Sequence, residues 1–238
     1  MNINIFLLCY NESALLPHVI NHYKKYIPSC NITIYDNEST DNSVEIAKKL
    51  GCKVISFTSN NIQNEFNQKN IKNNCWKNIK SGWVIMADMD ELLCITKEEL
   101  KQERDNGTTI LNVKGLNMIG QSQTNDLTDI DLQEIVKYVE HPPESKKLCF
   151  LREGINEMNY DCGAHNCRPI GNVKYSNKTY INKHMDYLGL NFYINKMINR
   201  YQRSHQMRQY GLDVHYINDI MDITDNYEYQ LKNCKYLK

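Results

Sequence analysis

The stretch Trp83-Val84-Ile85-Met86-Ala87-Asp88-Met89-Asp90-Glu91 is the most informative part of the sequence. Its first five residues are apolar, which is typical of a strand covered on both faces within a parallel sheet. Three acidic residues stand at or just after its carboxyl end. Open α/β sheets bind their ligands beyond the carboxyl ends of their strands. The stretch therefore predicts a buried strand that delivers carboxylates to a binding cleft.

The residues before this stretch repeat the same pattern of apolar segment, polar turn and helix. We expect strands at 3–9, 32–35 and 54–57, and helices at 15–23, 44–50 and 66–79. This alternation predicts a doubly wound α/β sheet with right-handed crossovers. Polar clusters at 10–12, 36–41 and 88–91 each follow a predicted strand. We therefore expect these clusters to meet at one edge of the sheet.

Beyond Glu91 the pattern is less regular. We expect strands at 109–113, 147–151, 173–175 and 179–183, and helices at 130–139 and 192–210. The last helix carries Lys196, Arg200 and Arg203 and no acidic residue. It could wall a phosphate or acceptor site, or lie on a membrane surface as a peripheral contact.

The composition excludes some classes of protein. With 28 basic and 28 acidic residues the net charge is zero, which argues against a protein that coats nucleic acid. The apolar run at 5–9 is too short to span a membrane, and no signal peptide precedes it. Nine cysteines, an odd number, favour free thiols in a reducing compartment. We therefore expect a cytoplasmic protein without a transmembrane segment.

Asp88 and Asp90 are candidate metal ligands. Residues i and i+2 of an extended segment project to the same side, so both carboxylates can face one point. A divalent ion, Mg²⁺ or Mn²⁺, relieves the repulsion and can also bind substrate phosphate oxygens. Alternatively, one aspartate caps a helix and the other is solvated. Neither G-x-G-x-x-G nor G-x-x-x-x-G-K-[ST] occurs, which disfavours a dinucleotide oxidoreductase or a P-loop NTPase.

Three motifs together resemble those of GT-A-fold glycosyltransferases of the family 2-like and family 92-like group. They are Cys9-Tyr10-Asn11-Glu12, then Asp36-Asn37-Glu38-Ser39-Thr40-Asp41-Asn42, then 83–91. The resemblance implies a Rossmann-like, mostly parallel sheet with flanking helices in a single domain over 1–190. Residues 1–95 would bind the nucleotide sugar and residues 96–190 the acceptor. A carboxyl-terminal helical extension would cover 191–238.

The resemblance also implies roles for particular residues. The residues expected along the nucleotide sugar are Tyr10, Asn11, Glu12, Asp36, Asn37 and Asp88. Asp88, Asp90 and His184 would hold Mn²⁺ or Mg²⁺, and Glu91, His165 and Arg200 are orienting or acceptor-site candidates. For the two histidines an ordinary structural role is the alternative. The segment 183–187 departs from the family pattern at Met185 and Asp186, which leaves its role open.

These observations predict a metal-dependent glycosyltransferase. It would transfer a sugar to a hydroxyl group of a glycan, lipid or protein. The motif resemblance implies that the donor is a UDP-sugar. An inverting transfer needs a base, for which we select Asp161 because it lies four residues before His165; Glu153, Glu157 and Asp186 remain candidates. A retaining enzyme would need no such base. One alternative is a catalytically inactive nucleotide- or glycan-binding module. The other is a sugar-phosphate nucleotidylyltransferase, which would require a glycine-rich, basic amino-terminal loop that this sequence lacks.

Overall fold

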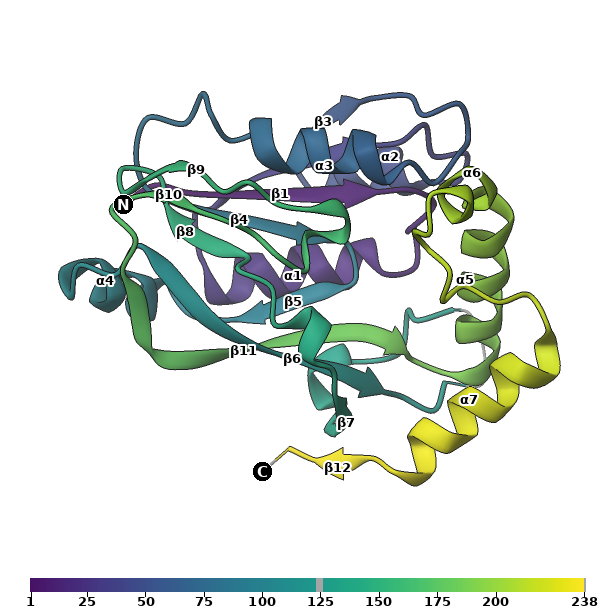
Figure 1. The fold of residues 1–238 in the computed structure, drawn as a ribbon. Helices are drawn as coiled ribbons and strands as arrows, with labels where there is room; N and C mark the ends of the chain where they lie inside the picture. Colours follow the sequence, from purple (N-terminus) through teal and green to yellow (C-terminus); the bar gives the residue numbers. More distant parts are fainter. Residues whose placement is uncertain (123–125, 238) are drawn as a thin grey trace.

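The computed structural model describes residues 1–122 and 126–237. Within this part of the chain, a ten-stranded sheet runs in the order β12-β7-β6-β8-β4-β1-β2-β3, with β11 paired to β5 and β6 (Figure 1). Its strands are β1 (Ile3–Cys9), β2 (Asn31–Asp36), β3 (Lys53–Ser56), β4 (Trp83–Asp88), β5 (Glu91–Cys94), β6 (Ile110–Ile119), β7 (Lys137–Glu140), β8 (Cys149–Leu151), β11 (Tyr175–Tyr187) and β12 (Lys235–Tyr236). Strands β9 (Ile155–Glu157) and β10 (Ile170–Gly171) form a separate pair.

The helices surround this sheet. They are α1 (Leu16–Tyr26), α2 (Ser43–Lys49), α3 (Glu65–Asn74), α4 (Lys97–Asp105), α5 (Leu190–Arg203), α6 (His205–Gln209) and α7 (Ile220–Lys232). Short 3₁₀ turns are η1 (Leu132–Glu134), η2 (Pro142–Glu144) and η3 (Cys162–Ala164). No helix of the described residues has the length and apolarity that crossing a membrane requires.

The parallel part of the sheet confirms the predicted α/β class. Strands β3, β2, β1 and β4 lie side by side in parallel. The chain adds β2 and β3 on one side of β1 and then β4 on the other, so the strand order reverses between β1 and β4. Such a reversal opens a crevice at the carboxyl ends of the two strands. Beyond β4, strands β8, β6 and β7 continue the sheet in antiparallel order.

Alternate residues of β1 and β4 enter two different hydrophobic cores. Ile5 and Leu7 pack with Val19 and Ile20 of α1, whereas Phe6 packs on the opposite face in the core that contains Trp76. This alternation follows from the two-residue period of a strand. It explains why both strands appear as continuous apolar runs, and it holds the acidic residues after β4 on a rigid support.

Three of the predictions for individual elements are wrong. The two strands predicted at 173–175 and 179–183 are one strand, β11. Residues 130–139 do not form a helix but the turn η1 and strand β7, which pairs with β6. The open edge of β6 supplies hydrogen-bond partners that local periodicity cannot reveal. The basic helix predicted at 192–210 breaks at Ser204 into α5 and α6. The chain after 191 also returns to the sheet, because β12 pairs with β7.

Candidate active site

A cavity of about 960 Å³ lies at the carboxyl ends of β1 and β4. Tyr10 follows β1, and Asp88 and Asp90 follow the apolar part of β4. Helix α5 stands beside the carboxyl end of β1 (Figure 1) and contributes Lys196 and Arg200 to the wall. Residues 211–216, between α6 and α7, complete the lining. The crevice expected from the strand order is therefore present and strongly charged.

Asp88 is neutralised by two lysines that come from different parts of the chain. Lys72 of α3 lies 2.8 Å from Oδ1, and Lys146, shortly before β8, lies 3.2 Å from Oδ2. Both lysines are buried. Burial opposes ionisation of Asp88, but the two ammonium groups outweigh it and lower the pKa of this carboxyl to about 2. Asp88 is therefore a carboxylate at neutral pH.

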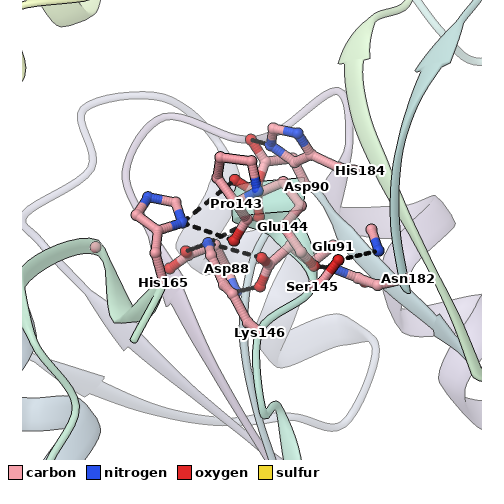
Figure 2. A network of polar contacts seen from close by, with 12 residues as sticks. Asp88, Asp90, Glu91, Pro143, Glu144, Ser145, Lys146, His165, Asn182 and His184 are labelled. Carbon is pink, nitrogen blue, oxygen red and sulfur yellow. Dashed lines mark hydrogen bonds and ion pairs between the residues drawn. The ribbon is translucent and has the colours of Figure 1, made fainter. Parts of the chain in front are cut away.

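Lys146 also connects two further acids (Figure 2). Its Nζ lies 2.8 Å from Glu91 Oε1 and 2.9 Å from Glu144 Oε2. The other oxygen of Glu91 accepts a 2.7 Å hydrogen bond from the backbone N–H of Asp88, so Glu91 holds the turn that carries Asp88. Burial raises the pKa of Glu91 to about 8. The turn after β4 thus depends on one buried ammonium group.

Asp90 faces a second set of cations. Its Oδ2 lies 2.7 Å from Lys196 Nζ, 3.3 Å from His184 Nε2 and 3.6 Å from Arg200 Nη2. Lys196 also lies 2.6 Å from Oδ1 of Asp186 in β11. Helix α5 and strand β11 therefore meet at Asp90, and the two aspartates of the motif are held by different partners.

His184 has a hydrogen-bond acceptor at each ring nitrogen. Nδ1 lies 2.7 Å from Asn117 Oδ1, and Nε2 faces the Asp90 carboxylate. Burial lowers the pKa of this imidazole, but Asp90 and Glu144 outweigh it and raise the pKa to about 9. A doubly protonated ring has no lone pair for a metal ion. With an acceptor at each ring nitrogen, His184 could ligate a metal ion only by giving up its contact with Asp90 or Asn117.

The positive charge of His184 predicts how the stability of the protein depends on pH. A folded-state pKa of about 9 exceeds the usual 6.5, so the contribution of His184 is complete below pH 6.5 and is lost as the pH rises through 9. We expect a loss of about 3 kcal/mol from this group over that range. Urea unfolding of the wild type and of His184→Gln at pH 6 and 9.5 measures this loss. The difference between the two proteins gives the contribution of His184, because the titration of Glu91 is common to both. Parallel pH dependences for the two proteins would contradict the assignment.

The predicted metal ligands do not form a ready metal centre. Over residues 1–122 and 126–237, no group of three or more His, Cys, Asp or Glu side chains is arranged to hold a metal ion. Asp88 and Asp90 are each in contact with an ammonium group instead. A divalent ion would compete with Lys72 for Asp88 and with Lys196 for Oδ2 of Asp90. The side chains present therefore do not fit the metal site expected from the sequence.

The predicted nucleotide-binding residues fall into two groups. Tyr10, Asn11, Glu12 and Asn37 line the cavity, whereas Asp36 does not. The Tyr10 ring lies under the guanidinium of Arg203, 3.2 Å from ring centroid to Cζ. Asp36 is buried behind this surface, where Oδ2 accepts a hydrogen bond from the backbone N–H of Ser39. Its role on the nucleotide stays a prediction.

Asn11 and Glu12 also have local structural roles. Asn11 Oδ1 accepts a 2.7 Å hydrogen bond from the backbone N–H of Thr40, and this contact holds the turn after β2 against the turn after β1. The Glu12 carbonyl accepts the N–H groups of Leu15 and Leu16 at the start of α1. Burial, with Asp90 nearby, raises the pKa of the Glu12 carboxyl to about 7.

Asp161 lies outside the cavity lining, contrary to the predicted catalytic position. Its side chain is half exposed and lies 3.7 Å from Arg168. The turn η3 explains the difference, because Gly163 and Ala164 adopt positive φ angles and only the residues after Asp161 face the cavity. His165 does line it, with Nδ1 3.0 Å from the carbonyl oxygen of Pro143.

Several residues of the site carry no individual signal in the sequence. They are Lys72, Glu144, Lys146, Asp213 and Tyr216. Tertiary structure brings them together from α3, η2, the segment before β8 and the loop after α6. In the sequence, the absence of acidic residues from the segment that forms α5 indicated a basic wall of the site.

Comparison with known proteins identifies relatives of the amino-terminal part. Protein RfbJ of Shigella flexneri is 40% identical over 55 residues, which are 23% of this chain and 43% of that protein. The uncharacterized glycosyltransferase RP128 of Rickettsia prowazekii (strain Madrid E) is 34% identical over 101 residues, 42% of this chain and 31% of that protein. The chain thus spans less than half the length of these curated relatives.

A structural relative covers more of the chain at lower similarity. The crystal structure of S. aureus TarS 1-349 in complex with UDP has a TM-score of 0.48 and 14% identity, and the match covers 96% of this chain and 71% of that 1-349 chain. The family model described as glycosyl transferase family 2 matches residues 4–93, which contain β1 to β4 and all three sequence motifs. The motif resemblance is thus confirmed, because residues 4–93 of this chain match the model of glycosyl transferase family 2.

Proposed function

We propose that this protein transfers a sugar from a nucleotide-sugar donor to a hydroxyl group of an acceptor. The observation that carries the proposal is the position of Asp88 and Asp90 at the strand-order reversal, in the wall of a large cavity that the basic side of α5 also lines. This is the edge at which α/β sheets bind nucleotides. The family match over residues 4–93 supports the same class of reaction.

We propose one orientation of the donor in the cavity. Tyr10, stacked on Arg203, offers a flat face beside β1 for the nucleotide base. Lys196 and Arg200 line the cavity on the same face of α5 as Arg203, and there the diphosphate would find positive charge. A UDP-sugar is the first donor to test, because the motif resemblance implies it. The diphosphate would bind without the predicted Mn²⁺ or Mg²⁺, because lysines contact both aspartates.

The acceptor needs a base if the transfer inverts the sugar's configuration. Asp213 fits this role better than Asp161, because it lines the cavity and its Oδ2 is buried without a hydrogen-bond partner among the described residues. Burial, with Glu65 nearby, raises the pKa of Asp213 to about 7. A carboxylate with such a pKa can accept a hydroxyl proton near neutral pH.

The rival function is a binding module that has the fold and no turnover. A panel of UDP-glucose, UDP-galactose, UDP-N-acetylglucosamine, GDP-mannose and dTDP-glucose separates the two, with release of the nucleoside diphosphate as the readout. We expect release with one donor, and we expect Arg200→Gln to reduce it about 10–100-fold through loss of a charge-assisted contact. Lys49→Met, in an exposed pair with Glu45, is the control. Binding of a donor without any release would favour the module.

A further inference from the structure

We infer that this site binds the diphosphate of its donor through side-chain cations, without a divalent metal ion. The inference rests on the proposed function and concerns how the same site neutralises phosphate charge. It departs from the metal dependence expected from the sequence. Three groups of contacts in the described residues support it.

The first support is a basic stripe on α5. Lys196, Arg200 and Arg203 recur at positions i, i+4 and i+7, so they share one face of the helix. All three line the cavity, and α5 contains no acidic residue. A nucleotide in the cavity would therefore meet three positive side chains from a single rigid element.

The second support is that these cations retain donor capacity. Lys196 Nζ contacts Asp90 and Asp186, and an ammonium group has a third N–H for a phosphate oxygen. Arg203 donates through Nε to the carbonyl of Asn61, while its buried Nη2 has no hydrogen-bond partner among the described residues. A buried guanidinium nitrogen without a partner is costly. A phosphate oxygen would satisfy it once the guanidinium turns toward the cavity that Arg203 lines.

The third support is that both aspartates of the motif are already paired with cations of the protein. Lys72 Nζ lies 2.8 and 2.9 Å from the two carboxylate oxygens of Asp88, and it is 3% exposed. Asp90 is held by Lys196, Arg200 and His184. A metal ion entering between them would be repelled by these cations at short range. The aspartates instead serve to position the lysines and arginine that face the ligand.

The test measures binding of UDP to the full chain by isothermal titration calorimetry, after dialysis against EDTA and again with Mn²⁺. We expect the same Kd in both conditions, within a factor of about two. Binding that is lost in EDTA and restored by Mn²⁺ would overturn the inference and leave the proposed function standing. If neither UDP, GDP nor dTDP binds in either condition, the proposed function itself fails, and the inference with it.

Substitutions at Lys196 sharpen the test. We expect Lys196→Met to weaken UDP binding in EDTA about 10–100-fold, because a charge-assisted phosphate contact is lost. Since Asp90 then loses its ammonium partner, we also expect Mn²⁺ to restore part of this binding. Lys196→Arg keeps the charge and should retain metal-free binding; Lys49→Met is the surface control. Wild-type affinity of a folded Lys196→Met protein in EDTA would contradict the assignment, and Arg203→Gln repeats the test if that variant does not fold.

Discussion

Replacement of Lys146 by methionine is expected to lower the free energy of unfolding by about 3–5 kcal/mol. Lys146 is 4% exposed, and its ammonium group lies between Asp88, Glu91 and Glu144. Methionine preserves most of the side-chain volume, so the effect isolates the charge. Without it, buried carboxylates remain next to one another and either repel or take up protons. Urea unfolding at pH 7 measures the change.

Lys49→Met provides the matched control for this experiment. Lys49 is paired with Glu45 one helical turn away, and both side chains are largely exposed. An exposed pair of this kind contributes only about 0–1 kcal/mol. If Lys146→Met proves as mild as Lys49→Met, the acids around Lys146 do not depend on it. In that case the turn after β4 is stabilised mainly by the hydrogen bond from Asp88 to Glu91.

The second large effect is expected at Asp213. We expect Asp213→Asn to lower kcat about 10²–10⁴-fold, the usual contribution of a general base. The KM for the donor should change little, because the cations proposed to hold the diphosphate remain. The wild-type rate should fall as the pH decreases through about 7, where Asp213 takes up a proton, and the variant should lose this limb. Steady-state kinetics from pH 5.5 to 8.5 measure both quantities.

Asp161→Asn is the control for Asp213→Asn, because it makes the same chemical change outside the cavity lining. We expect it to alter kcat by about twofold or less, as surface substitutions do. A large loss at Asp161 with none at Asp213 would restore the assignment made from the sequence. Little loss at either position, together with a product of retained configuration, would mean that the reaction uses no such base.

Local sequence was sufficient for the amino-terminal half of the fold. The apolar runs of β1 and β4 predicted strands with two buried faces, and their residues do enter two cores. The same information was insufficient at 130–139, where strand β7 forms only because β6 offers an unpaired edge. Hydrophobic period is a local property, whereas edge pairing depends on a strand more than ten residues away in the chain.

For the site, the sequence by itself determined which acids stand at the carboxyl end of β4 and that α5 is basic. Position after a strand fixes where Asp88 and Asp90 lie, since the sheet carries them there. Only the tertiary structure decided what these acids contact. Lys72, Lys146 and Lys196 reach them from α3, from the segment before β8 and from α5, at separations of 16, 58 and 106 residues. Charge pairing over such distances depends on how the elements pack, and no local pattern of residues encodes it.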